Sequence, residues 1–153
     1  MTKTKAQQIM AATEARAADD VTAAIKDIAT EFEPYIIKQR RHFHKHPELS
    51  LAEERTTSDI ANQLDAMNIP YERPLKTGLV ATLRGTASDA YHEDGTPRRR
   101  ILLRADIDAL PVTERNDCEW RSQNEGVMHA CGHDMHAAVP VSYTHLRAHE
   151  TTL

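Results

Sequence analysis

Apolar residues recur at helical spacing in the first third of the chain. Five of them are separated by four, three, four and four positions, which places them on one stripe of an amphipathic helix. They are Val21, Ile25, Ile28, Phe32 and Ile36. Pro34 interrupts this stripe, and we interpret it as the first turn of a second helix from Ile36 to Phe43 rather than as a kink in one helix. We expect residues 1–20 to be a flexible N-terminus.

Another helix is predicted after the polar stretch that follows. Ser50 and Glu53 have the spacing of a capping box, in which each side chain bonds a backbone amide of the first helical turn. The helical face that follows consists of Thr57, Ile60, Leu64 and Met67. Pro70 predicts that this helix ends before it.

Beyond Pro70 the pattern changes to short apolar runs bounded by turn-forming residues, which is typical of strands. Two strands are predicted, at residues 78–85 and 100–106, and the polar stretch 86–99 predicts a long hairpin loop between them. A further helix is predicted to start near His133. Helices followed by strands and another helix predict an α/β fold rather than a bundle or a barrel.

Composition narrows the class of protein. Forty per cent of the residues are hydrophobic and 27% are charged, as in soluble globular domains. Lys and Arg total 19 against 23 Asp and Glu, so the net charge of −4 gives no electrostatic reason to expect nucleic acid or an anionic membrane as a partner. Two cysteines are too few for a disulfide scaffold, and the N-terminus lacks the apolar core of a secretory signal. We therefore expect a cytoplasmic protein whose partners are small molecules or proteins.

Paired acids end the second predicted strand. Asp106 and Asp108 are two residues apart, so on an extended chain their carboxylates point to the same side and can converge just beyond the strand. Carboxyl ends of strands are where open α/β sheets bind ligands. The alternative is that these acids cap a turn or pair with Arg104 and Arg115.

A cluster of potential metal ligands follows about twenty residues later. His129, Cys131 and His133 alternate, while His133 and His136 are spaced by one helical turn. Thiolate and imidazole bind divalent transition ions well, and Gly132 allows a sharp backbone turn between them. For any one of these residues a buried structural role is the commoner explanation. Four of them in eight positions, after paired acids, favour a metal site.

Two other groups carry weaker signals. The histidines of residues 40–50 could line a site, but they lie near a helix end beside Arg and Lys, where solvated cations are favoured, so we expect them to face solvent. Cys118 lies in a polar loop and is expected to be a partly buried bystander rather than a nucleophile.

Three motifs in order resemble the signature of the metal-dependent amidohydrolases of peptidase family M20. They are residues 41–50 (RHFHKHPELS), 103–111 (LRADIDALP) and 128–136 (MHACGHDMH). The match covers roughly residues 20–139 and is close to the branch of N-acyl amino acid amidohydrolases and hippurate hydrolases. The resemblance implies the N-terminal part of a zinc-peptidase-like α/β/α catalytic domain, truncated, over residues 21–139.

The resemblance also implies roles for single residues. Cys131 and His133 would be ligands of a two-metal centre, and Asp108 would support catalysis by orienting a ligand. The expected ions are zinc, manganese or cobalt, of which zinc suits a thiolate best. The implied reaction is cleavage of the amide bond of N-acyl amino acids or short peptides. A full-length parent would be expected to form a homodimer through an inserted domain.

Other parts of the family's site have no counterpart here. The general base is a Glu of a downstream Glu-Glu pair, and further His ligands follow it, but none can be placed in these 153 residues. We therefore expect this fragment to be inactive. The alternatives are a non-catalytic metal-binding fragment and a thiol-dependent hydrolase that uses Cys131 with His133 or His136.

The last residues form a separate segment in this interpretation. Pro140 is unfavourable inside a helix, and residues 141–151 (VSYTHLRAHET) resemble a translated adapter of transposon-based sequencing libraries. We therefore expect residues 140–153 to be a non-native tail, and we exclude His145 and His149 from the metal site.

Overall fold

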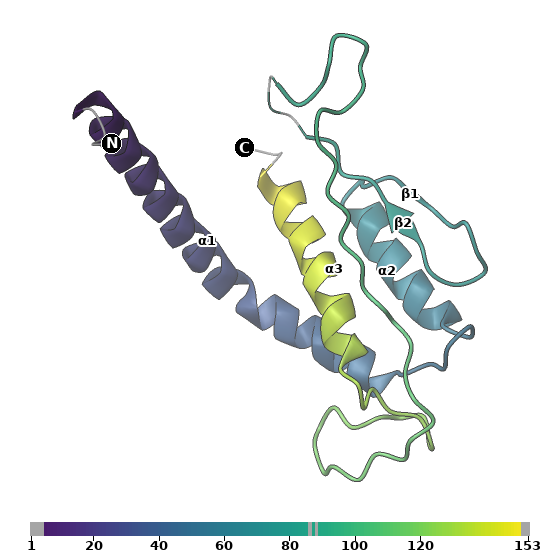
Figure 1. The fold of residues 1–153 in the computed structure, drawn as a ribbon. Helices are drawn as coiled ribbons and strands as arrows, with labels where there is room; N and C mark the ends of the chain where they lie inside the picture. The colour runs from purple at the N-terminus through teal and green to yellow at the C-terminus, as the bar shows by residue number, and fades with distance from the viewer. Residues whose placement is uncertain (1–4, 86, 88, 151–153) are drawn as a thin grey trace. The chain divides into compact units, whose positions relative to one another are not determined.

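The computed structural model describes residues 5–85, 87 and 89–150, without the side chains of residues 5–21, 24 and 145–150 (Figure 1). The chain divides into two units, residues 1–34 and residues 35–153. Its elements in order are α1 (Lys5–Lys45), α2 (Glu54–Ala66), β1 (Tyr71–Glu72), β2 (Val80–Ala81) and α3 (His133–Glu150). Helices with a small sheet confirm the predicted α/β class. Within the described residues, no helix has the length and apolar character needed to cross a membrane.

Helix α1 is one continuous helix, so the prediction of a second helix after Pro34 is wrong. Proline removes only one amide donor, and the residues on either side are compatible with a helix that continues through it. Within the second unit, the hydroxyl of Tyr35 donates to Gln63 Oε1 at 2.7 Å, and Phe43 is buried in the core. The flexible N-terminus stays a prediction, and its residues 1–4 lie outside the described part of the chain.

Helix α2 is confirmed, but its predicted capping box is wrong. Glu53 occupies the N-cap position and makes no side-chain cap bond. Instead, the Glu48 carboxylate accepts the backbone N–H groups of Arg55 at 3.1 Å and Thr56 at 2.7 Å. A turn with Leu51 at φ 66° separates Glu48 from the helix. An anion from a more distant position thus satisfies free donors and the positive end of the helix dipole.

The sheet is smaller than predicted. Strands β1 and β2 pair antiparallel, with Tyr71 opposite Ala81 and Glu72 opposite Val80, so only part of the expected strand 78–85 forms. No strand is assigned at 100–106 in the described residues, and the second strand prediction is wrong. An apolar run forms a strand when a neighbour pairs its backbone and covers its side chains. Here Ile101 and Leu102 are 89% and 86% exposed, so the segment is extended but uncovered.

The polar loop between these segments closes locally. The Arg98 amide donates to the Ala90 carbonyl at 2.9 Å, and the His92 amide donates to the Thr96 carbonyl at 2.8 Å. Gly95 has φ 79°, a conformation that glycine adopts without steric cost. A local turn with an isolated antiparallel bridge between Tyr91 and Pro97 therefore forms within the loop, but the predicted hairpin between strands 78–85 and 100–106 does not.

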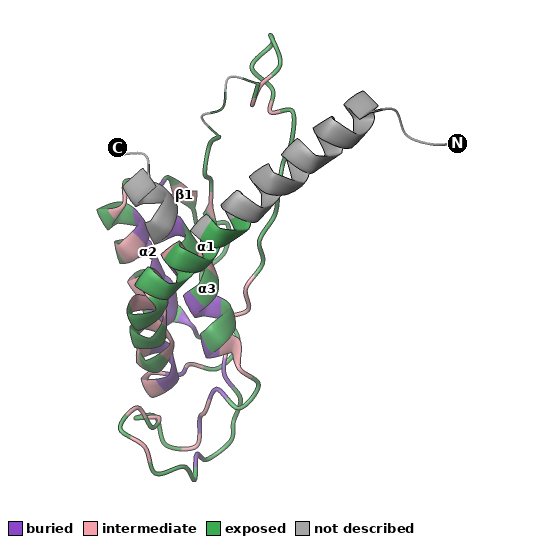
Figure 2. Cartoon of the chain, turned by 90° about the vertical axis from the view of Figure 1, so that its left-hand side faces the viewer, coloured by how far each residue is buried: buried purple, intermediate pink, exposed green. Residues whose placement is uncertain are grey.

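Helices α2 and α3 pack together around the core, and their facing sides are buried (Figure 2). The core residues are Phe43, Ile60, Leu64, Ile69, Ala137, Ala138 and Val141. Helix α3 begins at His133 as predicted but continues through Pro140, so the expected poor helical continuation is wrong. Val141 is 5% exposed, and this burial favours the helix beyond the proline.

Candidate metal centre

Backbone hydrogen bonds bring the three sequence motifs together. The Ala109 amide donates to the Glu48 carbonyl at 2.7 Å, joining the second motif to the first. Leu110 and Met128 exchange two backbone hydrogen bonds, each of 3.0 Å, which join the second motif to the third. The segment after Asp106 is therefore fixed between the end of α1 and the residues that precede α3.

A tight turn places the third motif at the start of α3. Gly132 has φ 87°, the left-handed conformation that glycine favours, as its position in the motif led us to expect. Its carbonyl accepts the amides of Met135 at 3.0 Å and His136 at 3.3 Å, which closes the first helical turn. His133 and His136 consequently project to one side of this turn and Asp134 to another, because residues three apart share a helical face whereas successive residues are rotated by about 100°.

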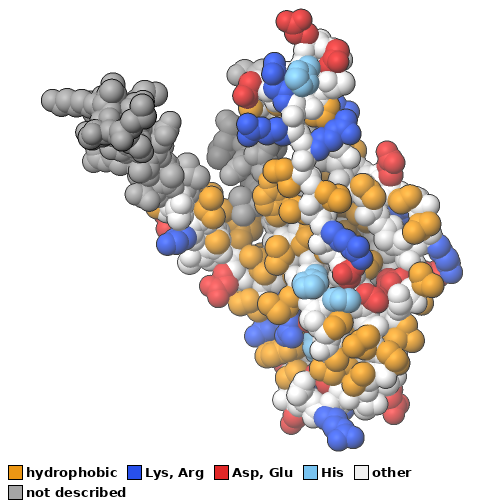
Figure 3. All heavy atoms as spheres, in the orientation of Figure 1, with side chains coloured by type: hydrophobic (Ala, Val, Ile, Leu, Met, Phe, Trp, Pro, Cys, Tyr) orange, Lys and Arg blue, Asp and Glu red, His pale blue; other side chains and the backbone are white. Residues whose placement is uncertain are grey.

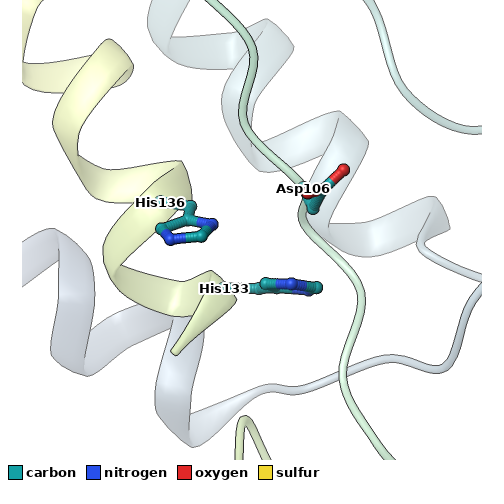
Figure 4. Close-up of side chains that lie close together, drawn as sticks. All are labelled: Asp106, His133 and His136. Carbon is teal, nitrogen blue, oxygen red and sulfur yellow. The ribbon is translucent and has the colours of Figure 1, made fainter. Parts of the chain in front are cut away.

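An open group of potential ligands lies on one side of this turn. Asp106, His133 and His136 each offer a ligand atom, and these atoms all lie within 4.8 Å of one another (Figure 4). Asp106 comes from the extended segment, while the two imidazoles come from α3 and are stacked with 5.4 Å between ring centroids. The space-filling view shows imidazole and acidic side chains at the surface among hydrophobic ones (Figure 3).

Asp106 also pairs with Arg104, as the alternative interpretation of the paired acids anticipated. The guanidinium donates to Oδ1 at 2.9 and 3.2 Å. This hydrogen bond lowers the pKa of the Asp106 carboxyl, so the group is anionic near neutral pH. A cation bound by Asp106 would compete with Arg104 for the same oxygen.

Asp108 orients His133. The Nδ1 atom of His133 lies 2.8 Å from the Asp108 carboxylate and 3.1 Å from its backbone carbonyl. Both partners are acceptors, so Nδ1 carries a hydrogen, and in the neutral tautomer with this arrangement Nε2 keeps its lone pair. A carboxylate behind a histidine in this way fixes the ring and increases its basicity as a metal ligand.

The donor types fit a divalent transition ion. Two imidazoles and a carboxylate are ligands that zinc, manganese and cobalt accept. Cys131 precedes the turn, is exposed and lies outside the group of three. Its role as a ligand stays a prediction, as do the roles of His133 and Asp108.

A buried polar cluster lies on the other side of the same turn, and sequence reasoning missed it. Asp134 is fully buried, and its carboxylate lies 2.8 Å from both Arg40 Nε and His44 Nδ1. His44 Nε2 lies 3.1 Å from the Glu114 carboxylate. His44 is only 3% exposed, so the expectation of solvent-facing histidines is wrong for this residue. Its i, i+4 spacing to Arg40 was the available signal, whereas Glu114 carried none.

The loop before α3 satisfies the remaining oxygens of Glu114. The Ser122 amide donates to this carboxylate at 2.6 Å, and the Asn116 side chain donates at 3.3 Å. Burial by itself would raise the pKa of Glu114, but the hydrogen bonds from Ser122, His44 and Asn116 outweigh it and lower that pKa. Glu114 is therefore an anion although it is 3% exposed.

His129 lies beside this cluster and has no hydrogen-bond partner for either ring nitrogen among the described residues. It is 4% exposed, and its ring centroid is 6.4 Å from that of His44. Burial lowers the pKa of His129, and the neighbouring Asp134 opposes this shift only in part. The neutral ring belongs to the interior rather than to the open group.

Comparison with protein families and curated sequences gives relatives of this chain. Residues 102–150 match the model of peptidase family M20/M25/M40. An uncharacterized hydrolase of Staphylococcus aureus (strain USA300) is 51% identical over 102 residues, which are 67% of this chain and 24% of that protein. An uncharacterized hydrolase of Staphylococcus epidermidis is 49% identical over the same shares. The chain thus spans about a quarter of the length of the curated relatives it matches.

Solved structures also resemble this fold. The Bacillus subtilis YXEP protein, a dinuclear metal binding peptidase from the M20 family, superposes with a TM-score of 0.62 at 38% identity, over 73% of this chain and 30% of that one. A proposed aminohydrolase from methicillin resistant Staphylococcus aureus superposes with a TM-score of 0.69 at 34% identity, over 84% and 32% of the two chains.

Proposed function

This chain belongs to peptidase family M20/M25/M40, and on that premise we propose that it is part of a metal-dependent hydrolase that cleaves the amide bond of N-acyl amino acids or short peptides. The observation that carries the proposal is the 2.8 Å contact between Asp108 and His133, which holds this imidazole where it also shares a group of potential ligand atoms with Asp106 and His136. Such a pair is the usual support of a metal ligand.

Cys131 and His133 are proposed as ligands of two divalent ions, with zinc, manganese or cobalt as the candidates. Support comes from the donor chemistry and from the dinuclear peptidase that the fold resembles. Bound ions supply Lewis-acid chemistry, because they polarise an amide carbonyl and acidify water. In this chain Asp108 holds the proton at His133 Nδ1, which keeps the opposite nitrogen available as a ligand.

Metal binding is the direct test of this part of the proposal. Co²⁺ added to the metal-free chain is expected to give visible absorption bands, and His133→Ala and Cys131→Ala should each weaken the binding. Asp94→Ala, in the hairpin away from the three motifs, is the control. A chain that binds no Co²⁺, or that binds it equally after both ligand substitutions, would contradict the proposed centre.

We further propose that these 153 residues do not turn over substrate by themselves, because the glutamate that would serve as general base is not among them. An assay of amine release from N-acetyl amino acids, with Co²⁺ or Zn²⁺ present, should detect no activity. Release that depends on His133 would overturn this point. A gene that encodes a downstream Glu-Glu pair and later histidines would support the hydrolase over a non-catalytic metal-binding fragment.

The segment 140–153 is proposed to be non-native, on its likeness to a translated sequencing adapter. Sequencing the gene across codons 138–153 tests this, and an uninterrupted frame that encodes the same residues would refute it.

A further inference from the structure

His44 connects three separate parts of the second unit through a buried bridge, defined here as Arg40, His44, Glu114 and Asp134. The imidazole lies one residue before the end of α1. Its Nδ1 reaches Asp134 in the first turn of α3 at 2.8 Å, and its Nε2 reaches Glu114 in the preceding loop at 3.1 Å. The three residues His44, Glu114 and Asp134 are between 0% and 3% exposed.

The bridge sets a guanidinium and an imidazole against two carboxylates. His44 Nδ1 lies near both the Asp134 carboxylate and Arg40 Nη2, at 2.8 and 3.4 Å, and Nε2 lies near the Glu114 carboxylate. The Arg40 guanidinium also pairs with Asp134 at 2.8 Å. In a buried site a charge of this kind is tolerated only when its partner is in place, so the bridge constrains the positions of all its members.

Its position relative to the candidate ligands gives the bridge a second effect. Asp134 lies between His133 and His136 in α3, and none of the bridge residues belongs to the open group of ligands. Each helical residue is rotated by about 100° from the one before, so holding Asp134 inward fixes the direction of its neighbours. In this direction, His133 Nδ1 lies 2.8 Å from the Asp108 carboxylate.

We propose that His44 is a positioning residue for the metal centre, acting through Asp134 on the orientation of His133 and His136. This inference rests on the proposed function, because it assigns to His44 the alignment of ligands in that centre. The competing explanation is that the bridge stabilises the fold and has no specific effect on His133.

The chain contains a matched control two residues away on the same helix. His42 Nε2 also lies 2.8 Å from a carboxylate, that of Asp59, but this pair links α1 to α2 and makes no contact with Asp134. His44→Gln is therefore compared with His42→Gln in the full 153-residue chain. Leu64→Ala, a core substitution 2% exposed before the change, serves as a purely destabilising control.

Two measurements separate the explanations. In the metal-free chain labelled with ¹⁵N-histidine, NMR reports which ring nitrogen of His133 carries hydrogen. We expect the Nδ1–H form in the wild type, His42→Gln and Leu64→Ala, and a mixture of forms in His44→Gln. In Co²⁺ titrations, we expect His44→Gln to weaken binding about tenfold or more, whereas His42→Gln changes it less than about twofold.

Each outcome decides something different. A folded His44→Gln chain with an unchanged His133 signal overturns the positioning role, whatever Co²⁺ does. A wild type that binds no Co²⁺ but loses the Nδ1–H form in His44→Gln refutes the metal centre and retains the positioning of His133. If His44→Gln does not melt cooperatively, the same comparison is made with Glu114→Gln, and an unchanged His133 signal there overturns the proposal.

Discussion

The two sides of the first turn of α3 differ in how deeply their polar side chains are buried and in whether those side chains have partners. On the buried side, Asp134 is 0% exposed, and its carboxylate lies 2.8 Å from both Arg40 Nε and His44 Nδ1. On the open side, His133 keeps about a quarter of its side chain exposed and His136 is exposed, with only one nitrogen of His133 engaged. The buried side pairs its charged groups with one another, although Asp134 Oδ1 has no hydrogen-bond partner among the described residues, whereas the open side leaves ligand atoms unused.

This difference follows from the cost of burial. A charged group removed from water must find a partner inside the protein, so the buried side can be built only from complementary groups. A ligand site instead needs lone pairs that are held in a fixed direction but are not used in hydrogen bonds within the protein. One turn of helix supplies both, and the buried side gives the open side a fixed orientation.

The strongest test of the comparison removes the buried carboxylate. Asp134→Ala leaves His44 and Arg40 without their shared partner and should lower the free energy of unfolding by about 3–5 kcal/mol. Asp59→Ala, which removes a carboxylate from the more exposed pair with His42, should cost about 0–1 kcal/mol. Urea unfolding followed by circular dichroism measures both changes. Equal decreases in the free energy of unfolding would show that the two environments do not differ in this respect.

The next test acts on the open side. Asp108→Ala removes the carboxylate behind His133 and should reduce Co²⁺ affinity about 10–100-fold, with a smaller change in stability than Asp134→Ala. Absorbance titration gives the affinity, with Asp94→Ala as the reference. If affinity is unchanged, Asp108 does not orient a ligand and the open side loses its main support.

The pH dependence of stability gives a third test, because the buried side depends on ionised carboxylates inside the protein. The pKa of Glu114 is below its ordinary value of 4.5 in the folded chain, so the unfolded chain binds more protons as the pH falls through this range. The contribution of Glu114 to stability is therefore complete above pH 4.5 and is lost as the pH falls through its folded pKa. Unfolding curves at several pH values should show a flatter acid dependence for Glu114→Gln, and an identical slope would contradict this.

The smallest effect on stability is expected where the chain is already exposed. Leu102 is 86% exposed within an uncovered apolar run, so Leu102→Lys should change the free energy of unfolding by less than about 0.5 kcal/mol. It should nevertheless reduce self-association in sedimentation velocity, because exposed extended apolar segments pair with other chains. Leu75→Lys changes an isolated exposed leucine as the control. Equal effects of the two changes would argue against association through this run.

Local patterns predicted part of this architecture well. The spacing of apolar residues predicted α2, a further helix was expected to start near His133, where α3 begins, and Gly132 was expected at the turn where it has φ 87°. Predictions that depended on neighbours were less successful. Residues 100–106 have strand-forming side chains but no pairing strand in the described residues, and the cap of α2 comes from Glu48 rather than from Ser50.

The candidate site divides in the same way. Types and spacing of side chains in residues 128–136 identified the chemistry, because thiol, imidazole and carboxylate groups at these intervals are suited to metal ions. The pairing of Asp108 with His133 across 25 positions, and of His44 with Asp134 across 90, could not be read from periodicity. Such contacts depend on how separate segments meet.

By itself, the sequence determined which residues carry donor atoms, where α2 lies and where α3 begins, since these are local properties of the chain. Only the tertiary structure decided which histidine is buried and which remains open. That choice depends on which charges face each ring, and those charges come from segments that are distant in sequence.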